Sequence, residues 1–238
     1  VEGVEPQSET VWRQADRYNV PRIAYINKMD RTGAEFEKNV QQMRDQLGAN
    51  AVPIQHPLGR EEHFKGVVDL VKMKAFIFED GGVFKEEDIP ADLKSAAEEA
   101  RTKMIEDIVQ SDEELMMKYL EGETLSTDEL TSAFKKAYLA NEVIPVLLGS
   151  AAKNIGISQL LDFVIEVGKK PSETSPKAAT LLSGEKIEVN ATEEEPLVAY
   201  IFKSVVDPFV GKLTFMKILS GTLKQGDTFI VVDQESLE

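Results

Sequence analysis

The sequence predicts an α/β fold in which a mostly parallel sheet with flanking helices carries an α+β insertion and is followed by the first strands of a β-barrel. Three observations lead to this prediction. Two short apolar runs, 21–26 and 143–148, each continue into a polar loop and then a helix, the order typical of parallel strands. Between them, short strand patterns precede three helical ones. After a segment rich in Pro, Ser, Thr and charge, alternating strand patterns resume.

The first 48 residues alternate between helix and strand. A helix is expected near Pro6, because a proline fits the first helical turn and apolar residues follow at helical spacing. The strand at 21–26 comes next. A second helix is predicted over 34–47, and Gly48 can end it in a left-handed conformation. Residues 1–48 are therefore assigned to the first domain.

Residues 49–142 are predicted to form an inserted subdomain. Its strand and then helix patterns fall at 52–56, 64–70, 74–78, 91–110, 112–120 and 127–141. A glycine turn is expected at 81–82, and Ser126 with Glu129 has the pattern of a capping box before the last helix. The subdomain is strongly acidic, since residues 79–129 contain 17 acidic and 5 basic residues.

The rest of the chain is assigned to three parts. Residues 143–168 complete the first domain with a buried strand and a helix at 157–168, 169–196 have the composition of a linker, and 197–238 open an incomplete β-barrel. The strands of this barrel are expected at 197–206, 209–220 and 228–233. Because three strands cannot close a barrel, the open edge predicts self-association of the chain.

The composition excludes several classes of protein. A net charge of −15 and a pI near 4.7 argue against binding DNA, whose phosphates repel an acidic surface, although a local basic patch can still contact RNA. The absence of cysteine rules out disulfides, thiol nucleophiles and cysteine-based zinc sites. With two histidines, no metal site is expected. No apolar run approaches the roughly 18 residues of a membrane-spanning helix.

A polar motif follows the strand at 21–26. Asn27, Lys28 and Asp30 of the sequence Asn-Lys-Met-Asp stand at a strand's carboxyl end, where α/β sheets bind ligands. Guanine offers two adjacent donors, its ring N–H and its exocyclic amine, and the carboxylate of Asp30 can accept both. Lys28 can lay its methylene stem over the ring, and Asn27 can tie the loop to neighbouring backbone. By itself, the motif is also compatible with an ordinary polar loop.

Ser150 and Ala151 follow the second buried strand in the same way. Such small residues allow a backbone N–H to approach closely, and in GTP-binding proteins this N–H donates to the guanine oxygen. Two base-reading loops at the ends of two strand patterns together predict a guanine-nucleotide site for GTP or GDP.

The phosphate-binding half of such a site is missing from the chain. No G-x-x-x-x-G-K-[ST] sequence occurs, and the D-x-x-G string at 30–33 shares its aspartate with the base motif. The loops that hold the phosphates and Mg²⁺ are expected upstream of Val1. Since neither end resembles a natural terminus, the chain is expected to be an internal piece that has no catalytic residue and no GTPase activity of its own.

Several stretches of the sequence resemble bacterial-type elongation factor G. They lie at 3–15, 27–34, 64–70, 87–90 and 207–215. The resemblance implies an incomplete P-loop-type GTPase domain with its inserted subdomain and the start of domain II. It further implies a cytoplasmic GTPase that promotes ribosomal translocation and contacts the ribosome, including ribosomal RNA. Ala152 departs from the family, which usually has Phe at that position.

The resemblance also assigns a partner to the insertion. Asp30 and Ser150 lie 120 positions apart, where a plain domain of this class needs only one helix and one strand. In the family, an acidic helix of the insertion docks the basic C-terminal domain of the ribosomal stalk protein. Glu99 and Glu106 fall on the polar stripe of the helix at 91–110, with Glu98 at its edge, so these three are the candidate contacts. A solvated helix face is the alternative.

Two other functions remain open from the sequence alone. The chain can come from a related translational GTPase, such as a release factor or a ribosomal-protection protein. It can also act by itself as an acidic interaction module without a nucleotide role.

Overall fold

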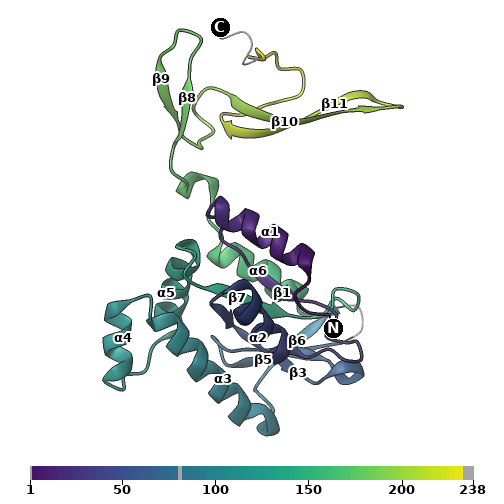
Figure 1. Cartoon of the computed structure of the whole chain (residues 1–238), viewed down its shortest axis with the longest axis vertical. Helices are drawn as coiled ribbons and strands as arrows, with labels where there is room; N and C mark the ends of the chain where they lie inside the picture. The colour runs from purple at the N-terminus through teal and green to yellow at the C-terminus, as the bar shows by residue number, and fades with distance from the viewer. Residues whose placement is uncertain (1, 80–81, 233–238) are drawn as a thin grey trace. The chain divides into compact units, whose positions relative to one another are not determined.

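The computed structural model describes residues 2–79 and 82–232, and the chain divides into two compact units, 1–168 and 169–238 (Figure 1). The division falls where the sequence places the end of the first domain. The boundaries of the inserted subdomain remain predictions.

The parallel sheet of unit 1–168 has the strand order β1-β7-β2. Its strands are β1 (Ala24–Ile26), β7 (Ile144–Leu148) and β2 (Ala51–Pro53). β7 is central, with Tyr25 opposite Leu147 on one side and Val52 opposite Pro145 on the other, and it is buried throughout. The prediction of one strand at 52–56 within the insertion is therefore corrected. Its first part, β2, belongs to the parallel sheet and pairs with the second edge of β7.

Two apolar clusters cover the two faces of β7. On one face, α2 (Phe36–Leu47) buries Phe36, Val40 and Met43 in a cluster that includes the alternating residues Ile144, Val146 and Leu148. On the other face, Leu147 joins a cluster with residues of the insertion and of α6 (Ile157–Val167). A parallel strand buried on both faces is continuously apolar, which explains why the run at 143–148 could be recognised.

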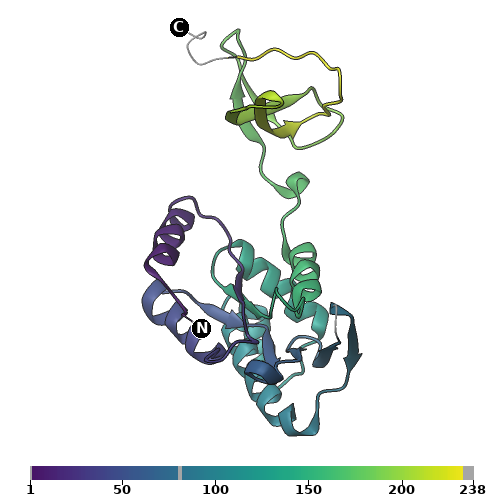
Figure 2. The ribbon, with the colours of Figure 1, turned by 90° about the vertical axis from the view of Figure 1, so that its right-hand side faces the viewer.

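The helices of the first domain begin and end close to their predicted limits. α1 (Pro6–Arg17) starts at Pro6 and packs beside α2 (Figure 2). α2 ends at Gly48, whose φ of 61° is the left-handed cap that the sequence predicts. α6 also confirms its prediction within one residue.

A four-stranded antiparallel sheet follows β2. Its order is β3-β4-β5-β6, with β3 (Gln55–Leu58), β4 (Gly66–Asp69), β5 (Lys74–Phe78) and β6 (Phe84–Glu87), and a short 3₁₀ helix, η1 (Glu61–His63), lies between β3 and β4. β6 was not predicted, because Phe-Lys-Glu-Glu has no apolar alternation. It is held by Phe84, whose ring lies 5.5 Å from that of Phe76 and 5.4 Å from that of Phe78. Gly81 of the predicted turn lies outside the described residues.

The three helices predicted in the insertion are confirmed as α3 (Ala91–Val109), α4 (Glu113–Leu120) and α5 (Thr127–Leu139). The capping box is also confirmed: Glu129 N donates to Ser126 Oγ over 3.3 Å, and Ser126 N donates to Glu129 Oε2 over 2.9 Å. Within the described residues, no helix is both long and apolar enough to cross a membrane.

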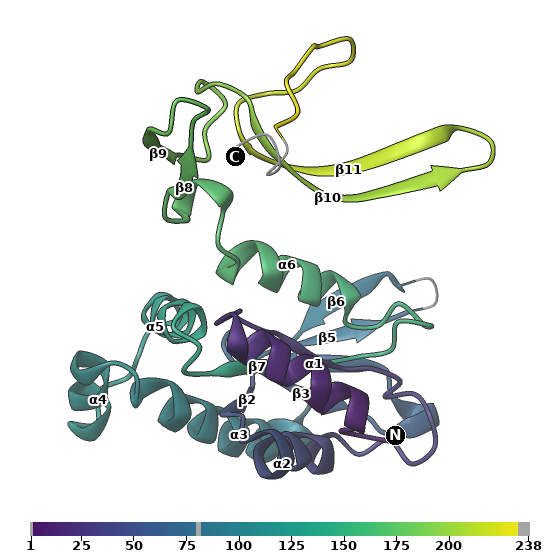
Figure 3. The same cartoon turned by 45° about the horizontal axis from the view of Figure 1, so that its top comes forward.

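The described part of the second unit, 169–232, contains two β-hairpins. β8 (Lys177–Thr180) and β9 (Lys186–Val189) lie in the segment predicted as a linker, and η3 (Pro171–Glu173) precedes them. This corrects the prediction: the strands are too short and polar to show a strand pattern, and their backbone pairing is what orders them. β10 (Val198–Asp207) and β11 (Gly211–Ser220) are the long hairpin of Figure 3 and confirm two predicted strands. Residues 228–232 of the third do not form a strand, and residue 233 lies outside the described residues.

Candidate functional site

The two predicted base-reading loops meet at one edge of the parallel sheet. β1 and β7 are neighbours, so their carboxyl ends lie side by side. Hydrogen bonds continue past the strands: Gly149 N donates to Ile26 O over 3.0 Å, and Met29 N donates to Gly149 O over 3.1 Å. The sheet therefore brings together loops that are more than a hundred residues apart in sequence.

Asn27 joins the two loops directly. Its Oδ1 accepts from Lys28 N at 2.7 Å and from Ala151 N at 2.9 Å. The second bond fits the expectation that Asn27 ties the loop to neighbouring backbone. The Ala151 amide, one of the backbone amides in the predicted Ser150-Ala151 loop, thus donates to a side chain here, and its role toward a guanine oxygen stays a prediction. A base oxygen would have to share that hydrogen or take it over.

Asp30 is the half-buried acid of the site. Its Oδ1 is buried and has no hydrogen-bond partner among the described residues. The neighbouring Ser150 hydroxyl is the main reason why the pKa of Asp30 lies below its usual value, and the charges of Lys153 and Arg31 act in the same direction against the effect of burial. Asp30 is thus an ionised acceptor at neutral pH, and a buried acceptor without a donor is rare in folded proteins.

Lys28 and Met29 have opposite environments that fix the loop. Met29 is 2% exposed and anchors the loop in the core, whereas the Lys28 side chain is exposed. Lys28 has a φ of 64°, an unusual left-handed conformation for a residue with a side chain. The turn that this produces is closed by Arg31 N, which donates to Lys28 O over 3.1 Å.

The second loop depends on residues that the sequence reasoning missed. Ser150 and Ile155 exchange two backbone hydrogen bonds of 3.0 and 2.9 Å, and the Tyr25 hydroxyl donates to Ile155 O over 3.1 Å. Burial raises the pKa of Tyr25 to about 12. A Cβ on Gly149 would lie 2.0 Å from the Tyr25 hydroxyl oxygen, so only glycine fits there. The signal available in the sequence was a glycine placed directly between a buried strand and Ser150.

Glu61 connects the insertion to the first loop. Its Oε1 accepts from Gly33 N at 2.7 Å, three residues beyond Asp30. Glu61 itself has a φ of 51°, which places its side chain from η1 against the loop. No sequence pattern predicts this contact.

The acidic residues predicted to bind the stalk protein belong to α3 and not to these loops. Glu98, Glu99 and Glu106 are exposed, while Ala97, Met104 and Ile108 on the opposite face are buried. Two of the three carboxylates already have partners in the chain. Glu99 pairs with Lys103 Nζ at 2.7 Å, and Glu106 Oε1 accepts from the Tyr119 hydroxyl at 3.2 Å. Among the described residues, no group of three or more His, Asp or Glu could hold a metal ion.

The parallel sheet, its flanking helices and the loops at its carboxyl edge define a P-loop GTPase fold. Residues 1–170 match the model of the elongation factor Tu GTP-binding domain, and residues 196–238 match the model of elongation factor G domain 2. The chain therefore belongs to the elongation-factor family of GTP-binding domains.

A crystal structure of a protein from Thermus thermophilus has the same fold, with a TM-score of 0.76 and 29% sequence identity. The match covers 95% of this chain and 31% of that chain. This chain accordingly spans about a third of the length of that protein.

Proposed function

We propose that this chain is the guanine-reading part of a translational GTPase of the bacterial elongation factor G type, which promotes ribosomal translocation in the cytoplasm. The observation that carries the proposal is the ionised carboxylate of Asp30, whose buried Oδ1 has no donor within the described residues. Guanine supplies two adjacent donors on one edge, and a carboxylate is the acceptor that takes both.

The neighbouring residues support the same ligand. The exposed Lys28 can cover the base with its methylene stem, and Asn27 holds the two loops at a fixed separation through Ala151. The Ser150 hydroxyl lowers the pKa of Asp30 and so favours its ionised form. We assign the phosphates and Mg²⁺ of GTP to loops in another part of the whole protein, because this chain contains no phosphate-binding motif.

The chain alone should therefore bind nucleotide weakly and hydrolyse none. The base loops offer two or three charge-assisted hydrogen bonds of about 1.5–3 kcal/mol each, against an association cost of about 4–15 kcal/mol. We expect a Kd for GDP above about 10 μM by calorimetry, since the remaining free energy is small. Tighter binding would contradict the proposal that the phosphate-binding half of the site lies outside this chain.

The test of the base assignment is Asp30→Asn in the full-length protein. Asparagine replaces one acceptor by a donor, which then faces the exocyclic amine of guanine, so GDP affinity should fall at least about tenfold. Xanthine has an oxygen at that position and should bind the variant better than guanine does. Competition between GDP and xanthosine diphosphate measures the change.

Asp92→Asn is the control, since it makes the same chemical change at an exposed position on α3. It should leave the preference for guanine unchanged. If Asp30→Asn also keeps that preference, Asp30 does not read the base.

A second proposed role is docking of the insertion on a basic partner, for which we propose the C-terminal domain of the ribosomal stalk protein. The exposed Glu98, Glu99 and Glu106 on α3 support this role. Exposed charges are screened over about 8–10 Å in physiological salt, so binding should be weak and should weaken further as salt rises.

The double change Glu99→Lys and Glu106→Lys should abolish this binding in an NMR titration with the stalk domain. Glu121→Lys with Glu123→Lys is a matched control, because it alters the net charge equally in the turn after α4. Equal loss in both variants would show only a charge effect, and unchanged binding in the first would place the contact elsewhere.

The alternative is that the chain comes from a related translational GTPase, such as a release factor or a ribosomal-protection protein. Such a protein would act on the ribosome in a step other than translocation. A translocation assay with the full-length protein decides it, because a release factor or a ribosomal-protection protein would not advance the messenger RNA. Absence of guanine binding in that protein would instead favour the acidic interaction module.

A further inference from the structure

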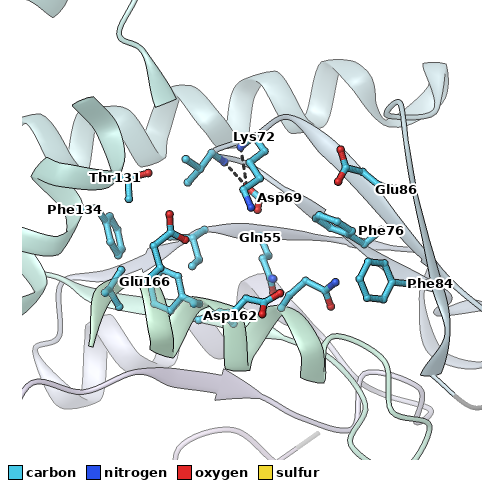
Figure 4. Close-up of a pocket in the computed structure, with 16 residues that line it drawn as sticks. Gln55, Asp69, Lys72, Phe76, Phe84, Glu86, Thr131, Phe134, Asp162 and Glu166 are labelled. Carbon is cyan, nitrogen blue, oxygen red and sulfur yellow. Dashed lines mark hydrogen bonds between the residues drawn. The ribbon is translucent and has the colours of Figure 1, made fainter. Parts of the chain in front are cut away.

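A cavity of about 240 Å³ lies within unit 1–168, between α6, α5 and the four-stranded sheet (Figure 4). Its lining shares no residue with Asn27, Lys28, Asp30, Ser150 or Ala151. It is therefore a space distinct from the base loops. The volume is slightly below the roughly 300–1,000 Å³ typical of small-molecule sites, so it suits a ligand of about one ring and a short chain.

The walls of the cavity are aromatic. Phe76 and Phe84 line it from the sheet, in an edge-to-face pair at 5.5 Å. Phe134 of α5 and Phe163 of α6 form a second such pair at 5.9 Å. Ring faces of this kind attract cations that lie within about 6 Å of the ring centre.

One buried polar group in the lining has no partner. Gln159 is 8% exposed, and its Oε1 has no hydrogen-bond donor among the described residues. The other lining amide, Gln55, is satisfied at its oxygen, which accepts from Leu148 N at 3.1 Å. Since buried acceptors are normally paired, Gln159 leaves one acceptor for a ligand that donates.

The mouth of the cavity is acidic. Asp162 and Glu166 follow Gln159 on the same face of α6, and Figure 4 shows Asp162 beside Gln55 and Glu166 farther along the helix, beside Phe134. Glu86 is a third exposed carboxylate, and no described cation lies within ion-pair distance of these three. Lys72 is the cation of the lining, and Asp69 is occupied by Val71 N and Lys72 N at 2.8 Å each.

We propose that this cavity binds a small organic ammonium ion with an aromatic or short apolar stem. The stem fits between the phenylalanine rings, the ammonium group donates to Gln159 Oε1, and Asp162 and Glu166 neutralise its charge. An anion would be repelled by the three carboxylates. A neutral molecule could pack against the rings but would leave the charge of the carboxylates without a counterpart.

The test uses 2-phenylethylammonium as the probe and 2-phenylethanol as its neutral counterpart of nearly equal shape. Both are titrated into the whole chain, and the amide shifts of α6 and β6 are followed by NMR. We expect the ammonium ion to bind at least fivefold more tightly than the alcohol, with shifts concentrated at 159–166 and 84–87. Equal affinity of the two probes, or shifts confined to other residues, would overturn the proposal.

Variants locate the site independently. Asp162→Asn with Glu166→Gln should weaken ammonium binding at least fivefold, and Gln159→Leu should weaken it at least about tenfold, the size expected from one lost charge-assisted hydrogen bond. Glu121→Gln with Glu123→Gln also removes two negative charges, but in the turn after α4, whose residues do not line the cavity. This control should leave the affinity for the ammonium ion unchanged. Unchanged binding in the α6 double variant would contradict the proposal. If that variant does not fold, the comparison of the two probes on the unaltered chain still decides.

Discussion

The two units of the chain differ sharply in how much apolar surface they bury. In unit 1–168, Leu147 and Leu148 of β7 are both 0% exposed. In the described part of unit 169–238, the buried residues are Val189 and Ser220, while Phe209 is 96% exposed. The difference follows from layering: the parallel sheet is covered by helices on both faces, whereas a two-stranded hairpin has no second layer to cover it.

This contrast teaches where the folding free energy resides. Fully buried side chains in two clusters on either side of β7 stabilise the first unit, since burial of apolar area is the dominant favourable term. The second unit gains mostly backbone hydrogen bonds, whose net contribution is small because water competes for the same groups. The loops of the candidate nucleotide site are attached to the strongly packed unit.

The largest expected effect comes from Leu147→Ala. The side chain is fully buried at the centre of the parallel sheet, so the change should lower the free energy of unfolding by about 2–5 kcal/mol. Urea denaturation of the whole chain measures it. Leu161→Ala is the matched control, because Leu161 on α6 is 58% exposed, and it should change stability by no more than about 0.5 kcal/mol. Similar losses in both variants would remove the contrast between core and surface.

Gly149→Ala should have the next largest effect. The added Cβ would lie 2.0 Å from the Tyr25 hydroxyl oxygen and 2.3 Å from Ile155 O, and overpacking of this kind costs about 1–3 kcal/mol. Adding Tyr25→Phe removes the first of these clashes and should recover part of the loss. A double variant that is no more stable than Gly149→Ala alone would assign the cost to the Ile155 carbonyl.

Protonation of Glu129 at low pH should have a smaller effect on the free energy of unfolding. The hydrogen bond from Lys118, followed by those from Ser126, lowers the pKa of Glu129 to about 2. Because the folded pKa lies below the unfolded value, the stabilisation is complete above the unfolded pKa and is lost as pH falls toward 2. The side chain is 35% exposed, so solvent screening keeps the effect small. Carboxyl NMR shifts of Glu129 should titrate near pH 2, whereas a midpoint above 4 would show that the α4–α5 pairing does not form.

The smallest effect on stability is expected from Phe215→Ala in β11. Phe215 is 45% exposed and contacts Phe202 at a ring distance of 6.4 Å, so the free energy of unfolding of the whole chain should change by no more than about 0.5 kcal/mol. The same change should reduce self-association in sedimentation experiments, because it removes an exposed aromatic group. A loss above about 2 kcal/mol would reveal a core in the second unit.

Local sequence signals determined most of the helices and several strands. Apolar spacing placed α2, α3 and α6 within one or two residues, and the residues that end or begin helices could be recognised: Gly48 by its freedom at positive φ, Ser126 by its capping box. These features depend on a few neighbouring residues, which is why one sequence sufficed. The base loops could be placed for the same reason, since each follows directly on an apolar strand.

Only the tertiary structure decided the features that join distant parts of the chain. The pairing of β2 with β7, the strand β6 and the hairpin β8–β9 arise from backbone hydrogen bonds to partners that no local pattern names. The same holds for the bond from Gly33 N to Glu61, the bond from Ala151 N to Asn27 and the cavity beside Gln159. The sequence by itself determined which residue types stand at the ends of two strands. The packing of segments more than a hundred residues apart decided which of their polar atoms are already paired and which remain available to a ligand.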